Sequence, residues 1–98
     1  MAQELAERGE RFGLDVRWQL VKGNRRNLLL RYKPKSRPGY RLLLAPHMDT
    51  VVANEGQLKP VLKQGKIYGR GACDTKGSIA AMVDALVQVI ASPDRPQD

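Results

Sequence analysis

The chain has 98 residues, of which 42% are hydrophobic, and this length allows at most one small domain with a modest core. Its composition excludes fibrous and disordered proteins, and its single cysteine, Cys73, excludes an intrachain disulfide. The net charge of +7 means that nucleic acids and anionic surfaces have to be considered as partners.

The N-terminal residues 2–12 are predicted to form a helix, because their apolar side chains recur at helical spacing among charged ones. Gly13 followed by Leu14 is typical of a glycine C-cap, which ends the helix. A charged segment of this kind is not a signal peptide, and no apolar stretch elsewhere is long enough to span a membrane. We therefore expect a cytoplasmic protein without a membrane partner.

A β-hairpin is predicted after this helix. Residues 16–20 alternate apolar and polar side chains, which is typical of a strand with one buried and one exposed face. Gly23 and Asn24 supply a turn, so residues 27–32 are predicted to pair antiparallel with the first strand. The prolines in residues 33–39 predict a surface loop.

The second half of the chain indicates the fold class. Residues 42–45 form a short apolar run without alternation, which predicts a central strand covered on both faces, and residues 52–66 show no regular pattern. Residues 78–91 are predicted to form a mostly apolar helix that Pro93 stops. These elements predict an α/β fold with a partial mixed, mostly parallel sheet and flanking helices. Such a sheet leaves an edge and a face exposed, so we expect part of a larger domain.

His47 and Asp49 form the first candidate site. They follow the predicted central strand two residues apart, so their side chains leave the same side of an extended backbone. In open α/β sheets, ligand sites gather at the carboxyl ends of central strands. A carboxylate suits a metal-bound histidine, whose second ring nitrogen must be held, although a lone histidine at a strand end is more often a surface residue.

The second candidate segment, residues 69–77, is rich in glycine and lies directly before the helix of residues 78–91. Its glycines allow a tight turn that brings Asp74 into a constrained position. The order of residues matches neither a dinucleotide-binding motif nor a phosphate-binding loop. Taken alone, Asp74 has a structural alternative, because aspartate is also a good helix N-cap.

Together the two segments resemble the metallopeptidase family that includes acetylornithine deacetylase, succinyl-diaminopimelate desuccinylase, aminoacylase and glutamate carboxypeptidase. The resemblance is carried by residues 27–29, 42–51 and 65–77 and by the start of the last helix. Pro46 and Thr75 depart from the commonest family pattern, which has a small residue and a methionine there. Neither is an expected ligand.

By position, the resemblance implies that His47 binds one metal ion, that Asp74 bridges two, and that Asp49 is a catalytic residue that orients His47. It implies two zinc ions, with cobalt as a substitute, and a shared water whose pKa falls toward about 7, so that hydroxide can attack a carbonyl. The family also supplies a Glu-Glu pair that includes the general base, a further acidic ligand and a distant histidine. We cannot place these groups within the 98 residues.

The resemblance therefore implies that residues 1–98 are an incomplete catalytic domain of a zinc peptidase, without the second domain that serves as a lid or in dimerisation. In full form, the enzyme is expected to cleave the amide bond of an N-acyl amino acid, as acetylornithine deacetylase does, or of a small peptide, and to be able to form a homodimer. The 98-residue piece alone is expected to be inactive.

Two alternatives stay open. Eight of the 17 basic residues lie between Lys22 and Arg41, as in a nucleic-acid-binding module, although solvated strand faces explain such a cluster more simply and no nucleic-acid partner is predicted. The other alternative is a catalytically inactive relic with the same fold, kept for association through its exposed sheet edge.

Overall fold

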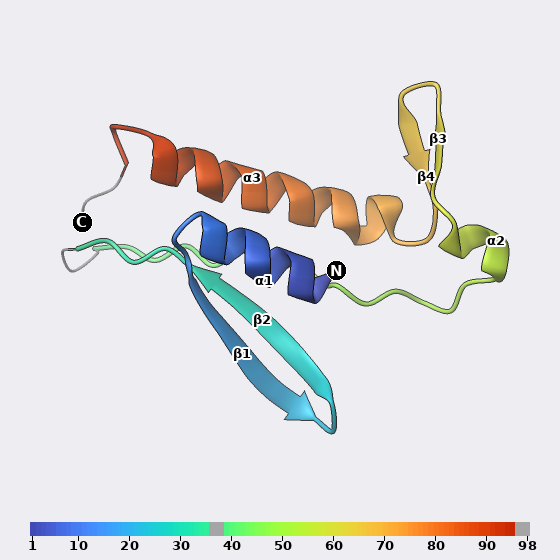
Figure 1. Ribbon diagram of the computed structural model, residues 1–98, viewed down its shortest axis with the longest axis horizontal. Coiled ribbons are helices and arrows are strands. Elements are labelled where there is room, and N and C mark those ends of the chain that lie inside the picture. Colours follow the sequence, from blue (N-terminus) through green and yellow to red (C-terminus); the bar gives the residue numbers. More distant parts are fainter. Residues whose placement is uncertain (36–38, 96–98) are drawn as a thin grey trace. The chain divides into compact units, whose positions relative to one another are not determined.

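A computed structural model describes residues 1–35 and 39–95, which divide into two compact units, Met1–Leu42 with Leu86–Asp98, and Leu43–Ala85. The first unit holds α1 (Ala2–Arg11), β1 (Asp15–Lys22) and β2 (Arg25–Arg31). The second holds α2 (Glu55–Leu58), β3 (Val61–Lys63) and β4 (Lys66–Tyr68), and α3 (Ser78–Ala91) runs from the second unit into the first (Figure 1). Among the described residues, no helix combines the length and the apolar character needed to cross a membrane.

The helix α1 ends at Arg11, one residue before the predicted end, and Gly13 follows it as the predicted glycine of the C-cap. Gly13 has a left-handed φ of +73°, and its N–H donates to the Glu10 carbonyl at 3.0 Å, while the N–H of Leu14 donates to the Gly9 carbonyl at 3.0 Å. These two bonds form the Schellman motif, in which glycine adopts the left-handed conformation at little cost. The motif turns Leu14 inward, where only 6% of it stays exposed.

The predicted hairpin is confirmed, because β1 pairs antiparallel with β2 and Val16 lies opposite Leu30. The helix α1 packs on this pair at Gly9, where a Cβ atom would lie 2.8 Å from the Leu30 side chain and 3.3 Å from that of Val16. The missing side chain of Gly9 therefore lets the helix approach the strands closely. Farther along the hairpin, Trp18 and Leu20 are 41% and 66% exposed, so α1 covers only the near end.

The near end of the hairpin also holds a cluster of ion pairs around Asp15. Its Oδ2 atom accepts from Arg31 Nη2 at 2.7 Å, from Lys33 Nζ at 2.9 Å and from Arg17 Nε at 3.1 Å. The hydrogen bond from Lys33, and next the one from Arg31, hold the pKa of Asp15 well below its usual range. The ionised carboxylate therefore favours the folded hairpin.

Acid should weaken this unit through Asp15. A carboxyl group with a depressed pKa in the folded state stabilises the fold fully above its unfolded pKa of about 3.9, and this stability is lost as the pH falls toward the folded value. We expect the free energy of unfolding to decrease below about pH 5, and to decrease less steeply in Asp15→Asn, which has no carboxylate at this position to protonate. Urea unfolding followed by the fluorescence of Trp18 at a series of pH values measures this. An identical pH dependence in both proteins would contradict it.

The second unit contains three elements that the sequence analysis did not predict, α2, β3 and β4. The helix α2 begins with a capping box, in which Asn54 Oδ1 accepts from the Gln57 N–H at 3.0 Å and Gln57 Oε1 accepts from the Asn54 N–H at 3.2 Å. The turn between β3 and β4 has positive φ at both Gln64 and Gly65, as a two-residue hairpin turn of type I′ requires. Both signals are short-range and visible in the sequence.

Residues 42–45 do not form the predicted central strand. Leu42, Leu43 and Leu44 are 87%, 76% and 47% exposed, and the stretch 40–54 contains neither helix nor strand. Both sheets in the described part of the chain are antiparallel pairs, so the predicted parallel pairing is not seen there. A strand is held by hydrogen bonds to its neighbours, and a parallel neighbour needs a long crossover, whereas a hairpin needs only a short turn. The structure is thus α/β, with small antiparallel sheets.

The remaining predictions concern α3 and the loop of residues 33–39. The helix α3 has the predicted bounds, and Ile79, near its start, is 5% exposed. Residues 33–35 and 39 have neither helix nor strand, as a loop requires, and residues 36–38 lie outside the described part of the chain.

Candidate metal centre

His47 and Asp74 meet in the second unit, although 27 positions separate them in the sequence. The Nε2 atom of His47 lies 2.9 Å from Asp74 Oδ1. His47 follows Pro46 in the strandless stretch 40–54, and Asp74 lies in the irregular turn Ala72–Gly77 that leads into α3. The two residues that the resemblance implies as metal ligands are therefore in direct contact.

The other ring nitrogen of His47 faces Asp49. Nδ1 lies 3.0 Å from the backbone carbonyl oxygen of Asp49 and 3.5 Å from its carboxylate Oδ1. Since a carbonyl oxygen can only accept a hydrogen bond, Nδ1 carries the proton in the neutral ring. Asp49 thus fixes the orientation of the imidazole, mainly through its backbone, with its side chain close by.

This tautomer leaves a bare lone pair on Nε2, pointing at a carboxylate oxygen of Asp74. Two lone pairs at 2.9 Å repel each other unless a cation lies between them, and either a proton or a metal ion meets that need. The hydrogen bond with the Asp49 backbone, and next the one with the Asp74 carboxylate, raise the pKa of His47 above its ordinary range. The pair is therefore built to hold positive charge.

A loop with unusual backbone angles positions Asp74. Gly71 has a left-handed φ of +78°, and a Cβ atom there would lie 2.7 Å from Thr50 Cγ2. The carbonyl of Gly71 accepts from the Lys76 N–H at 2.9 Å, which closes the turn around Asp74. Asp74 itself has φ −112° and ψ 90°, lies four positions before Ser78, the first residue of α3, and uses Oδ1 to contact His47. The alternative role of Asp74 as a helix N-cap does not account for this contact with His47.

Arg70 and Gln57 support the loop, and sequence reasoning did not connect them. Arg70 Nη2 donates to Gln57 Oε1 at 2.9 Å, and the Arg70 backbone N–H donates to the Gln57 carbonyl at 2.7 Å. Because Gln57 also forms the capping box with Asn54, these bonds tie α2 to the glycine-rich loop. The capping pattern Asn54 to Gln57 was the signal in the sequence that could have identified α2.

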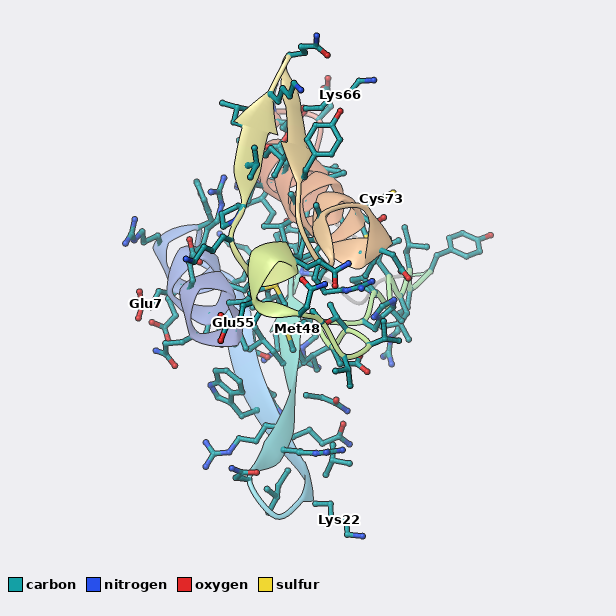
Figure 2. The ribbon with its side chains drawn as sticks, turned by 90° about the vertical axis from the view of Figure 1, so that its right-hand side faces the viewer. Glu7, Lys22, Met48, Glu55, Lys66 and Cys73 are labelled. Carbon is teal, nitrogen blue, oxygen red and sulfur yellow. The ribbon has the colours of Figure 1, made fainter. Side chains whose placement is uncertain are left out.

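A cavity of about 540 Å³ surrounds the pair and is open to solvent. His47, Asp49 and Asp74 all line it, and their side chains are 51%, 92% and 87% exposed. Cys73, beside the start of α3, lines it too and is a free, exposed thiol (Figure 2). Further ligands and a substrate can therefore reach the imidazole and the carboxylate.

His47 and Asp74 are suitable zinc ligands, but they are fewer than a zinc site needs. An imidazole nitrogen and a carboxylate oxygen are both common zinc ligands, and a catalytic zinc takes three ligands from protein. Within residues 1–35 and 39–95, no group of three or more His, Cys, Asp and Glu side chains is placed to hold a metal ion. The described residues thus provide part of a metal site.

Known proteins of one family are similar to this chain. The profile of peptidase family M20/M25/M40 matches residues 43–98. A succinyl-diaminopimelate desuccinylase of Alkalilimnicola ehrlichii is 40% identical over 101 residues, which cover 97% of this chain and 26% of that protein. Proteins of the same name from Gluconacetobacter diazotrophicus and Sulfurovum sp. are 41% and 42% identical over 57% and 62% of this chain. The chain spans about a quarter or less of the length of these relatives. No solved structure matches it.

Proposed function

Because this chain belongs to peptidase family M20/M25/M40, we propose that it supplies part of the metal centre of a hydrolase that cleaves amide bonds. The observation that carries the proposal is the contact of His47 Nε2 with Asp74 Oδ1 at 2.9 Å, in a solvent-accessible cavity. The relatives named as desuccinylases support hydrolysis of an N-acyl amino acid, with a small peptide as the broader substrate class.

Each of the three residues has a separate role in this proposal. His47 offers the lone pair of Nε2 as a metal ligand, and Asp49 holds the opposite nitrogen, Nδ1. The Asp74 carboxylate has two oxygens, which can serve two cations at once. Zinc, when bound, polarises the substrate carbonyl and makes hydroxide available near neutral pH. The general base and the remaining ligands are not assigned to any described residue.

Metal binding by the 98-residue protein tests the proposal directly. With only two donors placed, we expect weak binding, with a Kd on the order of 10–100 µM for zinc or cobalt, and no hydrolysis of N-acyl amino acids. Cobalt is the better probe, because its visible absorption reports coordination. Binding should be weaker at pH 6 than at pH 8, since a proton on Nε2 competes with the metal and the pKa of His47 is raised.

Three variants make this measurement decisive. His47→Ala and Asp74→Asn each remove a proposed donor, whereas the matched control Asp94→Asn removes a carboxylate from the turn after α3. Loss of the cobalt spectrum in the first two variants alone supports the proposal. Unchanged binding in both of them would show that the metal is held elsewhere.

A further inference from the structure

The first unit contains a basic cavity that the proposed hydrolase chemistry does not use. It has a volume of about 420 Å³ and shares no lining residue with the cavity around His47 and Asp74. Its cationic lining side chains come from Arg31, Lys33, Lys35 and Arg95. Among the described residues, Asp15 is the one carboxylate in its wall, so positive charge is in large excess.

The hairpin register explains how these cations gather. Asp15 lies directly opposite Arg31, so both side chains reach the same end of the strand pair. Lys33 and Lys35 follow at two-residue spacing, which places side chains on one side of an extended segment. Pro34 favours an extended backbone at Lys33, because proline disfavours the helical conformation of the residue before it.

Arg95 completes the wall from the turn after α3. Its backbone N–H donates to the Ser92 carbonyl at 3.2 Å, and its Nη1 donates to the Ile90 carbonyl at 3.3 Å. These two bonds hold the guanidinium group near the hairpin cations, since Ile90 and Arg95 line the same cavity. The wall therefore combines two separate segments of the first unit.

Asp15 does not balance this charge. Its Oδ2 atom already accepts from three cations, Arg17, Arg31 and Lys33, at 2.7 to 3.1 Å, and neither Lys35 nor Arg95 is among them. Cations that converge on one oxygen also repel each other at close range. Arg31 and Lys33 keep 42% and 49% of their side chains exposed, so a dissolved anion can reach them.

We propose that this cavity binds a compact oxyanion with two negative charges, such as a phosphate group or a short dicarboxylate. The four cations of the wall exceed the single carboxylate of Asp15 by three charges, so a dianion offsets most of the excess. Its several oxygen acceptors can also serve ammonium and guanidinium donors together. Chloride carries a single charge and has no separate oxygen acceptors, so it meets neither requirement. The site is distinct from the metal centre, and its existence does not depend on the proposed hydrolase activity.

Amide NMR of the ¹⁵N-labelled 98-residue protein tests this proposal. We expect saturable shifts at Gly13, Leu14, Arg31 and Lys33 on addition of inorganic phosphate or succinate at pH 7, with a Kd of about 1–10 mM. Sodium chloride at equal ionic strength is the reference, because it screens charge without bridging the cations. Saturation by phosphate alone identifies a phosphate ligand, and saturation by both anions identifies any compact dianion.

Single-residue variants distinguish binding in this cavity from unspecific attraction of anions to the positive charge of the whole protein. Lys35→Gln and Arg95→Gln leave the contacts of Asp15 intact and should each weaken binding about three- to fivefold. The matched control is Lys22→Gln, which removes the same charge at the turn end of the hairpin, where the side chain points away from the strands (Figure 2). Shifts no larger than those from chloride, or equal losses in Lys22→Gln and Lys35→Gln, would overturn the proposal.

Discussion

His47→Ala or Asp74→Ala should lower kcat/KM by on the order of 10³-fold in an active hydrolase that carries this chain. The loss of either proposed ligand removes several kcal/mol of transition-state charge stabilisation, and each 1.4 kcal/mol corresponds to about a factor of ten. A chimera provides such an enzyme. Residues 1–98 would replace the matching quarter of the Alkalilimnicola ehrlichii desuccinylase, to which they are 40% identical. Hydrolysis of succinyl-diaminopimelate is the readout.

Asp49→Asn should lower kcat/KM less than the loss of either proposed ligand does. Removing the partner of a metal-bound histidine typically costs 10- to 100-fold, and we expect about tenfold here, because the Asp49 backbone carbonyl keeps its bond to Nδ1. Asp94→Asn in the same chimera should leave activity unchanged. If the chimera is active and tolerates His47→Ala, the proposed role of His47 is wrong. A folded chimera without activity would favour the alternative of an inactive relic.

Gly71→Ala should destabilise the loop that carries Asp74 by about 3 kcal/mol. Two effects add up: an alanine at φ +78° is strained, and its Cβ would lie 2.7 Å from Thr50 Cγ2. Hydrogen exchange of the Ala72 and Lys76 amides measures the effect, because these N–H groups bond to the Gly69 and Gly71 carbonyls within the loop. Both amides should exchange faster, and cobalt binding should weaken with them.

Two further variants separate the steric part from the conformational part. Gly65→Ala, in the same unit, has a similar φ of +71° and no atom within 4 Å of the new Cβ, so we expect a cost of only about 1–2 kcal/mol. Thr50→Ser removes the methyl group that the new Cβ atom of Gly71→Ala would meet, and the double variant Gly71→Ala/Thr50→Ser should recover part of the loss. Equal effects of Gly71→Ala with and without Thr50→Ser would exclude the steric contribution.

Short-range features of the fold could be predicted from the sequence because their causes lie within a few residues. The glycine at position 13 ends α1, the alternation of residues 16–20 gives β1, and the apolar run of residues 78–91 gives α3. The capping box of Asn54 and Gln57, which begins α2, is an equally local signal. The caps lie within a few residues of the helices they delimit, and β1 reaches its partner β2 across a short turn.

The segment 42–45 shows where local reasoning fails. Its leucines have the composition of a buried strand, yet a strand forms only when neighbouring strands supply hydrogen bonds and cover, and within residues 1–35 and 39–95 none pairs with this segment. An apolar run indicates that a segment is suited to burial. It does not determine whether neighbouring elements cover that segment.

By itself the sequence determined the residue types of the candidate site, their order and, through them, the family. The tertiary structure decided that Nε2 of His47 meets Asp74, that the Asp49 backbone holds Nδ1, and that Asp15, in the wall of a basic cavity, accepts from three cations. The reason is physical: contacts between residues 27 positions apart depend on how turns and helices direct the chain. Hydrogen-bond partners, tautomers and pKa shifts are set by distances of a few ångströms, which residue order does not contain.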